Sequence, residues 1–480
     1  MQITAVKPRG GAGLGHRGRW WRLCGIALLT AAVTAVPVQA ADRPAAPARP
    51  ALRAAALPPD GASTGGLDGF TPILYTTTPD TGSIPQAWFI AHHAKNFQAP
   101  KVSCVIVSSG ELCGDANGNF TEWPKRLSIG TGPLGSETSY LLATTQLPQF
   151  VTDGLDSRVV RYPVVTVEPV AGFPNGSVGV GCLNMQSQTN CGYTPLAPKT
   201  DIPGVSNVNG LTGFVQVGDS LYGTATDGRQ LCYRITVGGA CPGQPFAGNT
   251  PPNNDRAFLG PSDYRGTTSV IDGKIYITSD GSDRARTTWP HPVTLTCFDP
   301  AFNVPCTGWT PVFVQYRDAY RILAIFPRYS PDGTVQPGVC TIAGNKTPAP
   351  PIVNCYDGTG NGAPPPLGLS EVFPAGGARS VVFQPLTIKL SDDLRTYFPF
   401  YTEDRTYLGQ TVCYSWTYAT ACERSGDLPG FPNPLSHWNV NGGDTHNYGY
   451  AYSPARACVY GGGDTGYVFG FNPVTGGTGC

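Results

Sequence analysis

Five segments of this sequence begin and end with cysteines that are nine residues apart. They are CVIVSSGELC, CLNMQSQTNC, CYRITVGGAC, CFDPAFNVPC and CYSWTYATAC. A disulfide needs its two Cα atoms roughly 5.5 Å apart, whereas nine residues span about 30 Å as a strand and about 13 Å as a helix. If these cysteines are oxidised, the chain must double back in every segment. The spacing therefore predicts five β-hairpins, each closed by a disulfide across its two strands.

The N-terminal residues make oxidation the expected state. Basic residues precede the apolar run LCGIALLTAAVTAVPV, which leads into the small-residue site Val38-Gln39-Ala40. This order predicts a secretory signal peptide over residues 1–40, and hence a protein that is secreted, extracellular or associated with the cell surface. The run is shorter than the roughly 20 residues needed to cross a bilayer, and no later segment is apolar enough to do so.

The number of cysteines agrees with export. Cleavage after Ala40 removes Cys24 from a total of 15 cysteines and leaves an even set, as expected where disulfides persist. The five local pairs are Cys104–Cys113, Cys182–Cys191, Cys232–Cys241, Cys297–Cys306 and Cys413–Cys422. Structural zinc would need tighter C-x2-4-C spacing with a second pair nearby, and redox-active cysteines favour C-x-x-C. The spacing therefore favours structural disulfides over both alternatives.

Composition indicates a folded all-β chain. The 61 Gly and 47 Pro break the sequence into short segments, while 10% aromatic and only 13% charged residues argue against disorder. Short β-rich runs alternate with Gly, Asp, Asn and Pro clusters, and no long helical pattern is present. Residues 41–66 are rich in Ala, Pro and Arg without periodicity, so we expect a disordered leader there. A single domain over residues 67–480 follows.

The charge balance excludes two classes of partner. Loss of the five basic residues of the signal leaves 32 acidic and 27 basic residues, a net charge of about −5. Nucleic acids and anionic membranes both require a basic patch. We therefore expect neither as a partner.

An internal repeat organises the domain. Residues 213–246 align with residues 267–313, and each unit has four expected antiparallel strands, with the turns Gly218-Asp219 and Asp272-Gly273 between the first two. From Cys104 to Cys458 the cysteine pairs begin at intervals averaging about 59 residues, so seven units fill residues 67–480. This predicts a seven-bladed β-propeller of four-stranded antiparallel blades, most of them clipped by a local disulfide.

Two units depart from the pattern. In the fifth, Cys355 occupies the place of the first cysteine, so a bridge to Cys340 would link the second and third strands. In the last, Cys480 matches the second cysteine but Gly470 stands in place of the first. A Cys458–Cys480 bridge then requires the C-terminal tail to fold back.

The phrases CFDP and FNPVTGG, together with the strand order, resemble β-propeller repeats of the kelch and quinoprotein type. The chain is also similar to secreted bacterial repeat proteins with a paired-cysteine hairpin. The resemblance is to an architecture rather than to one family, and no catalytic motif accompanies it. It implies that the loops between second and third strands share one rim with the loops that link blades.

Two segments are candidate binding sites, and the first is the longest expected loop between second and third strands. Residues 279–291, SDGSDRARTTWPH, supply Asp280, Asp283, Arg284, Arg286, Trp289 and His291. Residues 442–450, GGDTHNYGY, supply Asp444 and His446. One interpretation is a solvated polar loop with a packed tryptophan. The other is a recognition surface in which Trp289 stacks on a sugar ring or anchors a protein, and the charged groups form hydrogen bonds.

Signatures of catalysis and of cofactors are scarce. The five histidines after the signal form no H-E-x-x-H motif, and there is no G-x-S-x-G elbow or P-loop. SDDLRTYF (391–398) lacks the spacing and the glycine of a sialidase Asp-box. DANGNFTE (115–122) suggests a calcium loop through Asp115, Asn117 and Asn119 but lacks the required glycine and glutamate. We assign no catalytic residues, no metal and no cofactor.

These observations favour a secreted binding module, active as a monomer, that recognises a glycan or a protein outside the cell. A propeller enzyme such as a lactonase, lyase or glycosidase is the first alternative, and its site would converge in the central channel. A structural surface component is the second, and it would self-assemble.

Overall fold

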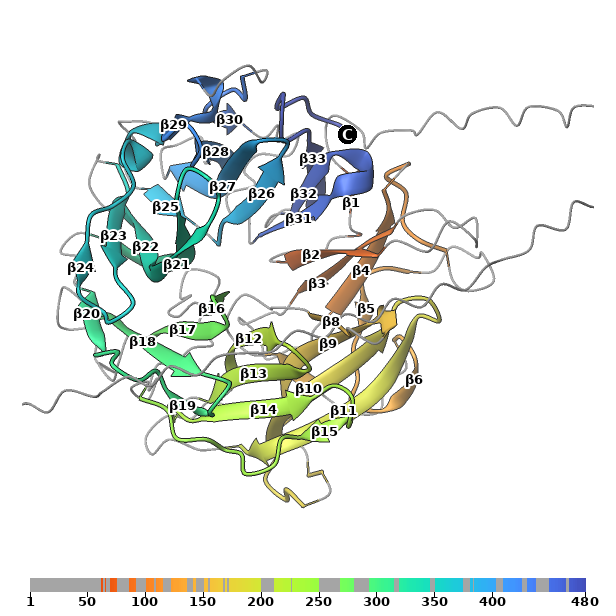
Figure 1. Ribbon diagram of the computed structural model, residues 1–480. Coiled ribbons are helices and arrows are strands. Elements are labelled where there is room, and N and C mark those ends of the chain that lie inside the picture. Colours follow the sequence, from red (N-terminus) through yellow and green to blue (C-terminus); the bar gives the residue numbers. More distant parts are fainter. Residues whose placement is uncertain are drawn as a thin grey trace, which may run out of the picture. The chain divides into compact units, whose positions relative to one another are not determined.

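The computed structural model describes residues 62–63, 65, 70–75, 86–91, 101–107, 109–114, 122–135, 141–143, 151–153, 156–166, 169–170, 172–199, 211–225, 227–249, 268–279, 293–314, 319–345, 350–373, 380–382, 384–402, 409–424, 430–436, 449–462 and 466–480. All of them belong to one compact unit, Arg53–Cys480. They form seven antiparallel sheets in a ring (Figure 1). This unit is therefore a seven-bladed β-propeller, as the repeat predicts.

Each blade has four strand positions, counted here from the centre of the ring outwards. Blade 1 contains β2 (Phe70–Tyr75), β3 (Gln86–Ala91), β4 (Lys101–Ile106) and β5 (Lys125–Arg126). Blade 2 contains β7 (Leu141–Ala143) and β8 (Val151–Asp153) at the innermost position, then β9 (Asp156–Thr166), β10 (Ser177–Asn184) and β11 (Thr189–Pro198), with β6 (Thr131–Pro133) as a fifth strand outside β11. Blade 3 contains β12 (Leu211–Val217), β13 (Ser220–Ala225), β14 (Gln230–Arg234) and β15 (Gly239–Ala240).

The outer strand of some blades is divided. Blade 4 contains β16 (Thr268–Ile271), β17 (Lys274–Ser279) and β18 (Val293–Asp299), followed by β19 (Val304–Pro305) and β20 (Val312–Val314). Blade 5 contains β21 (Ala319–Tyr329), β22 (Val335–Asn345), β23 (Ile352–Tyr356) and β24 (Gly362–Ala363). Blade 6 contains β25 (Ser380–Val382) and β26 (Leu386–Leu390), then β27 (Asp393–Thr402), β28 (Gly409–Ser415), β29 (Thr420–Ala421) and β30 (Leu435–Ser436).

Blade 7 contains β31 (Tyr450–Ser453), β32 (Cys458–Gly462) and β33 (Tyr467–Phe471), completed by β1 (Ala62–Ser63). Helical structure in the described ranges is limited to three 3-10 turns, which lie in or between blades 5, 6 and 7. They are η3 (Leu369–Val372), η4 (Cys422–Arg424) and η5 (Pro454–Arg456).

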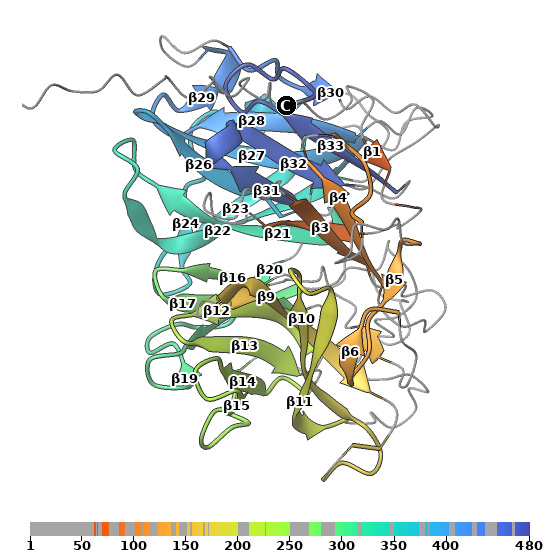
Figure 2. The ribbon, with the colours of Figure 1, turned by 90° about the vertical axis from the view of Figure 1, so that its right-hand side faces the viewer.

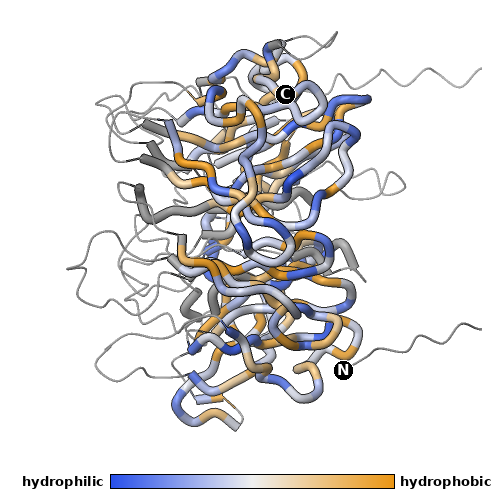
Figure 3. Tube along the Cα trace, turned by 60° about the vertical axis from the view of Figure 1, so that its left-hand side comes forward, coloured by the Kyte–Doolittle hydropathy of each residue, from blue (hydrophilic) through white to orange (hydrophobic). Residues whose placement is uncertain are grey.

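The core is divided among the blade interfaces. Seven clusters of buried side chains occur in the described residues, and each lies between two neighbouring blades. Between blades 3 and 4, for example, Tyr222 packs near Phe298 with ring centroids 5.9 Å apart. Hydrophobic segments are accordingly distributed over the whole described trace rather than gathered in one central core (Figure 3). A single blade lacks such a core, so its stability depends on its neighbours.

All seven expected disulfides are present in the structure. Five of them join cysteines nine residues apart, with Cα–Cα distances from 5.0 to 5.5 Å. In three of these hairpins the N–H of the second cysteine donates to the carbonyl oxygen of the first at 2.9 to 3.0 Å. Each clipped hairpin turns through a residue with positive φ, six residues after the first cysteine; these residues are Gly110, Gln188, Gly238, Asn303 and Ala419. The prediction of clipped hairpins is confirmed.

The two exceptional bridges also form. Cys340 and Cys355 lie directly opposite each other on β22 and β23, as expected. In blade 7, the N–H of Gly479 donates to the carbonyl oxygen of Gly470 at 3.0 Å, so Gly479 takes the place of the second cysteine. The alignment of Cys480 with that place was therefore wrong by one residue. The tail nevertheless folds back to form the Cys458–Cys480 bridge.

The ring closes through residues that the sequence analysis assigns to the leader. Ala62 and Ser63 form β1 and pair with Val468 and Tyr467 of β33. Ala62 is 3% exposed and belongs to the buried cluster between blades 7 and 1. The folded unit thus includes residues before the expected boundary at Leu67. The sequence did not indicate this, because a strand of two residues carries no recognisable pattern.

Candidate binding surface

The strand order gives the propeller two different rims. Because every blade runs antiparallel from the centre outwards, turns between first and second strands and between third and fourth strands share one rim, which we call the hairpin rim. Connections between second and third strands, and between blades, share the other, which we call the loop rim. Figure 2 shows β15, β19, β24 and β29 towards the same side of the ring, as this argument requires.

Several turns between first and second strands on the hairpin rim are short, although residues 76–85 join β2 to β3 in blade 1. Gly218 and Asp219 alone join β12 to β13, and Asp272 and Gly273 alone join β16 to β17. Both glycines have positive φ, at 59° and 69°, which suits tight hairpin turns. The turns predicted from the sequence are confirmed here.

The tips of the clipped hairpins are exposed, and their chemistry differs around the ring. Val237, Phe302 and Tyr418 lie at equivalent positions in blades 3, 4 and 6, five residues after the first cysteine, and are 69%, 76% and 47% exposed. Exposed serines, Ser109 and Ser187, take that position in blades 1 and 2. The fixed cysteine spacing predicts the positions of these tips, but the sequence alone does not show how exposed their side chains are.

The loop rim carries the longer connections. Residues 280–292 join β17 to β18 in blade 4, and residues 437–449 join β30 of blade 6 to β31 of blade 7. Both connections begin and end on the loop rim, as the resemblance implies. The two connections start from different blades, blade 4 and blade 6, so they are separate candidates.

The predicted site residues fall in these two connections or in residues 115–120. Asp280, Asp283, Arg284, Arg286, Trp289, His291, Asp444 and His446 lie outside the described residues, as do Asp115, Asn117 and Asn119. Their roles stay predictions. Among the residues that the structure does describe, no group of three or more His, Cys, Asp or Glu side chains is placed to hold a metal ion.

The anchor of the first connection is firmly held. Ser279 pairs with Thr294 across β17 and β18, and Cys297 on β18 is bridged to Cys306. Tyr276, opposite Cys297, packs edge-on against Trp309 at 5.2 Å. Burial, reinforced by the nearby Asp272 carboxylate, raises the pKa of Tyr276 to about 12, so its hydroxyl stays neutral. The connection thus leaves and re-enters a cross-linked and well-packed blade.

The anchor of the second connection is a contact between two blades. The hydroxyl of Tyr450, at the start of β31, hydrogen-bonds the hydroxyl of Thr411 on β28. The Tyr450 ring packs edge-on against Phe469 at 6.4 Å and against Phe471 at 5.6 Å. Beside Thr411, the buried side-chain oxygen of Gln410 has no hydrogen-bond partner in the described part of the chain. It is an acceptor at the foot of the loop rim that the sequence analysis missed.

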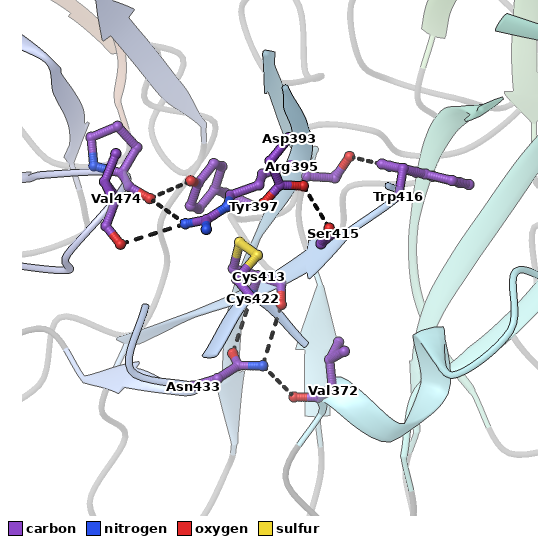
Figure 4. Close-up of a disulfide and its surroundings, with 12 residues drawn as sticks. Val372, Asp393, Arg395, Tyr397, Cys413, Ser415, Trp416, Cys422, Asn433 and Val474 are labelled. Carbon is purple, nitrogen blue, oxygen red and sulfur yellow. Dashed lines mark hydrogen bonds and ion pairs between the residues drawn. A yellow bond between two sulfur atoms is a disulfide. The ribbon is translucent and has the colours of Figure 1, made fainter. Parts of the chain in front are cut away.

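A buried ion pair lies in blade 6 (Figure 4). Arg395 and Asp393 are 0% and 1% exposed, and Nε of Arg395 lies 2.6 Å from Oδ2 of Asp393. The hydroxyl of Ser415 donates to the other carboxylate oxygen at 2.6 Å. Nη1 of Arg395 donates to the carbonyl oxygens of Pro473 and Val474 in blade 7, at 3.3 and 3.5 Å.

The same close-up explains how blade 6 holds the C-terminal tail. The hydroxyl of Tyr397 also donates to the carbonyl oxygen of Pro473, and burial raises the pKa of this tyrosine. Asn433 accepts from the N–H of Cys413 at 3.0 Å and donates to its carbonyl oxygen at 3.3 Å. These groups satisfy backbone atoms of the protein, so the cluster fixes the tail rather than offering a site for a ligand. The SDDLRTYF segment contains Asp393, Arg395 and Tyr397, although it is not an Asp-box.

Comparisons with known proteins give no family. No protein-family model matches the chain, and no curated protein matches it. Among solved structures, the chain is similar to the computationally designed Ika8 protein, with 10% identity, a TM-score of 0.41 and coverage of 87% of this chain and 88% of that one. It is also similar to BamB from Moraxella catarrhalis, with 11% identity, a TM-score of 0.35 and coverage of 65% and 66%. Neither likeness is close enough to support an argument about function.

The description of the molecule therefore depends on its own topology. None of the described helical turns is long and apolar enough to cross a membrane. The described residues form a seven-bladed β-propeller with seven disulfides, and the ends of both candidate connections lie on one of its two rims.

Proposed function

We propose that this protein is an extracellular binding module that recognises a glycan or a protein through its loop rim. The observation that carries the proposal is the position of both candidate connections, whose ends lie on the same rim and are fixed to disulfide-linked blades. Binding residues in proteins are concentrated on loops held by rigid scaffolds. The segment 280–292, with Trp289 among four charged residues and a histidine, is the strongest candidate for contact.

The physical advantage of this design is a low entropic penalty. Binding is weakened by every loop and side chain that must become ordered. Here the ends of the segment are held by the β17–β18 pairing and by the Cys297–Cys306 bridge. A tryptophan presents a large apolar surface with few rotatable bonds, so Trp289 would be the main anchor.

The test compares two aromatic substitutions in segments attached to opposite rims. Purified protein is probed on a glycan array and in pull-downs with cell-wall polysaccharide, and the same probes are applied to Trp289→Ala and Tyr418→Ala. Tyr418 is an aromatic residue on the hairpin rim, so its replacement controls for general loss of aromatic surface. We expect Trp289→Ala to weaken binding at least about tenfold, as for an interface hot spot, and Tyr418→Ala to bind like the wild type. No binding to any probe, or equal loss in both variants, would contradict the proposal.

Export is the second part of the proposal. Intact-mass analysis of protein collected outside the cell should give the mass of a chain that begins at Ala41, with all 14 remaining cysteines oxidised. Material that keeps residues 1–40, or that is found only inside the cell, would count against it.

A further inference from the structure

One of the seven disulfides lies outside the buried clusters of the propeller. Cys182 and Cys191, which clip the outer hairpin of blade 2, belong to none of the seven clusters in the described part of the chain. In each of the other six bridges at least one cysteine belongs to such a cluster, and Cys480 packs against one. Buried structural cysteines are inert, whereas accessible ones exchange with thiols. The Cys182–Cys191 bridge is therefore the one whose surroundings permit exchange.

The side chain of Cys191 is open to solvent. Cys191 is exposed, whereas the second cysteines of the other four clipped hairpins are buried, with exposures from 0% to 9%. The backbone of Cys191 runs between β10 and β6 within the sheet (Figure 1). A backbone that is paired on both sides contributes little exposed surface. The exposed part of this residue is therefore its side chain, which consists of Cβ and Sγ only.

A shift in strand register explains this exposure. In three of the other clipped hairpins the N–H of the second cysteine donates to the carbonyl oxygen of the first. In blade 2 the ladder is irregular between Cys182 and Leu183, and Cys182 pairs with Gly192 instead of Cys191. Gly192 has φ of 108°, which side chains rarely adopt. Cys191 is thereby displaced by one position from the place of a buried second cysteine.

The hairpin of blade 2 does not depend on its bridge. β10 and β11 pair at eight positions, whereas β14–β15, β18–β19 and β28–β29 pair at two positions each. β6 covers the outer edge of β11 through three further pairs. Opening the bridge therefore leaves the strand order and the register of blade 2 in place.

A cation lies beside the sulfur that would leave. Arg161 on β9 is directly opposite Cys182 on β10, so their side chains lie on the same face of the sheet. The Arg161 guanidinium lies over the Tyr233 ring of blade 3, 5.4 Å from its centroid. Val180, two residues before Cys182, packs towards blade 3 on that face. A nearby positive charge favours the thiolate form of a cysteine, and a stabilised thiolate leaves faster.

We propose that the Cys182–Cys191 bridge is a site of reversible thiol exchange, at which a small thiol compound becomes attached to Cys191. The compound gives its proton to solvent, and its thiolate attacks Sγ of Cys191. A new disulfide forms there, the Cys182–Cys191 bond breaks, and its electron pair leaves with Sγ of Cys182, which takes a proton from solvent. Attack by Cys182 on the mixed disulfide reverses the step and releases the compound. This role differs from the purely structural one expected from the cysteine spacing.

Peptide mapping of the full secreted protein in its folded state tests the proposal. The protein is incubated with glutathione without denaturant, and iodoacetamide then caps the released thiols. Glutathione should be found on Cys191 and the cap on Cys182, with the other six bridges intact. This bridge should open at least about tenfold faster than any other. Absence of glutathione from Cys191, or earlier opening of another bridge, would overturn the proposal.

Two serine variants test access to the sulfur directly. Cys182→Ser leaves Cys191 as a thiol, and Cys232→Ser leaves Cys241, which is 9% exposed. Both variants are treated with the aromatic disulfide dithiobis(nitrobenzoate), whose released thiolate is coloured, and circular dichroism verifies that both are folded. The Cys191 thiol should react at least about tenfold faster than the Cys241 thiol. Equal rates in the folded variants, or loss of the sheet signal in Cys182→Ser, would refute the proposal. These measurements do not use the loop rim, so their failure is distinguishable from failure of ligand binding.

Discussion

The buried pair formed by Arg395 and Asp393 gives the sharpest test of how the propeller is held together. Replacing Arg395 by Met removes an ionic hydrogen bond of 2.6 Å and two donors to the carbonyl oxygens of Pro473 and Val474. It also leaves the Asp393 carboxylate at 1% exposure without its cation. Breaking a buried pair in this way costs about 3 to 5 kcal/mol. We expect the free energy of unfolding to fall by about 4 kcal/mol.

Urea denaturation at neutral pH measures the free energy of unfolding. The dependence of this free energy on urea concentration is compared between variants, to confirm that unfolding exposes the same surface area. Hydrogen exchange adds a local readout, because the amides of residues 474–477 should lose protection first. Arg234→Met is the matched control. Arg234 also lies near an aspartate, Asp219, but at 3.9 Å and with side chains 49% and 40% exposed. An exposed pair of this kind contributes less than about 1 kcal/mol.

A double variant separates the charge from the packing. Asp393→Leu combined with Arg395→Met removes both charges, and buried pairs replaced by apolar residues often regain stability. We expect the double variant to be more stable than Arg395→Met alone. The reasoning is refuted if Arg395→Met behaves like Arg234→Met, or if the double variant is less stable than the single one.

Three further predictions concern other parts of the ring. Ala419 adopts φ of 50°, a left-handed conformation that costs a non-glycine residue about 1 kcal/mol, so Ala419→Gly should raise the denaturation midpoint; an unchanged or lower midpoint contradicts this. The pKa of Tyr276 is raised from 10.0 to about 12, chiefly by burial, so the folded state holds this proton more tightly and its contribution to stability is lost as pH rises from 10 to 12; Tyr276→Phe should flatten that loss in alkaline denaturation, and an unaltered slope argues against it. Replacing Cys458 and Cys480 together by serine opens a loop with a sequence separation of 22, which should lower the free energy of unfolding by about 3 kcal/mol and reduce the hydrogen-exchange protection of the tail. Full protection of the tail in the serine variant would show that the tail needs no bridge.

Much of the architecture follows from local spacing. A cysteine pair nine residues apart can be bridged only if the chain turns back, so the hairpins and their repetition were predictable from distances alone. The bridge between Cys340 and Cys355 was also predictable, because CYD at Cys355 resembles CFD at Cys297, the first cysteine of the blade 4 hairpin. Each of these inferences uses contacts within one blade.

Contacts between blades were the part that sequence reasoning missed. Nothing in the two residues Ala62 and Ser63 indicates that they pair with a strand near the other end of the chain. A charged residue within a strand is normally expected to face solvent, so the burial of Arg395 was not predictable from its own segment. Its partners in blade 7 are distant in sequence. The candidate binding residues cannot be judged in the same way, since they lie outside the described residues. What the fold adds is the position of both ends of each candidate connection on one rim.

The pairing of β1 with β33 also sets the order in which the molecule is completed. The earliest strand of the ring, β1, can pair with β33 only after the last stretch of the polypeptide has been made. A nascent chain halted before that point has six complete blades and an incomplete seventh blade. A chain trimmed past Ser63 would lack β1, so closure of the ring depends on two residues that lie far from β33 in the sequence.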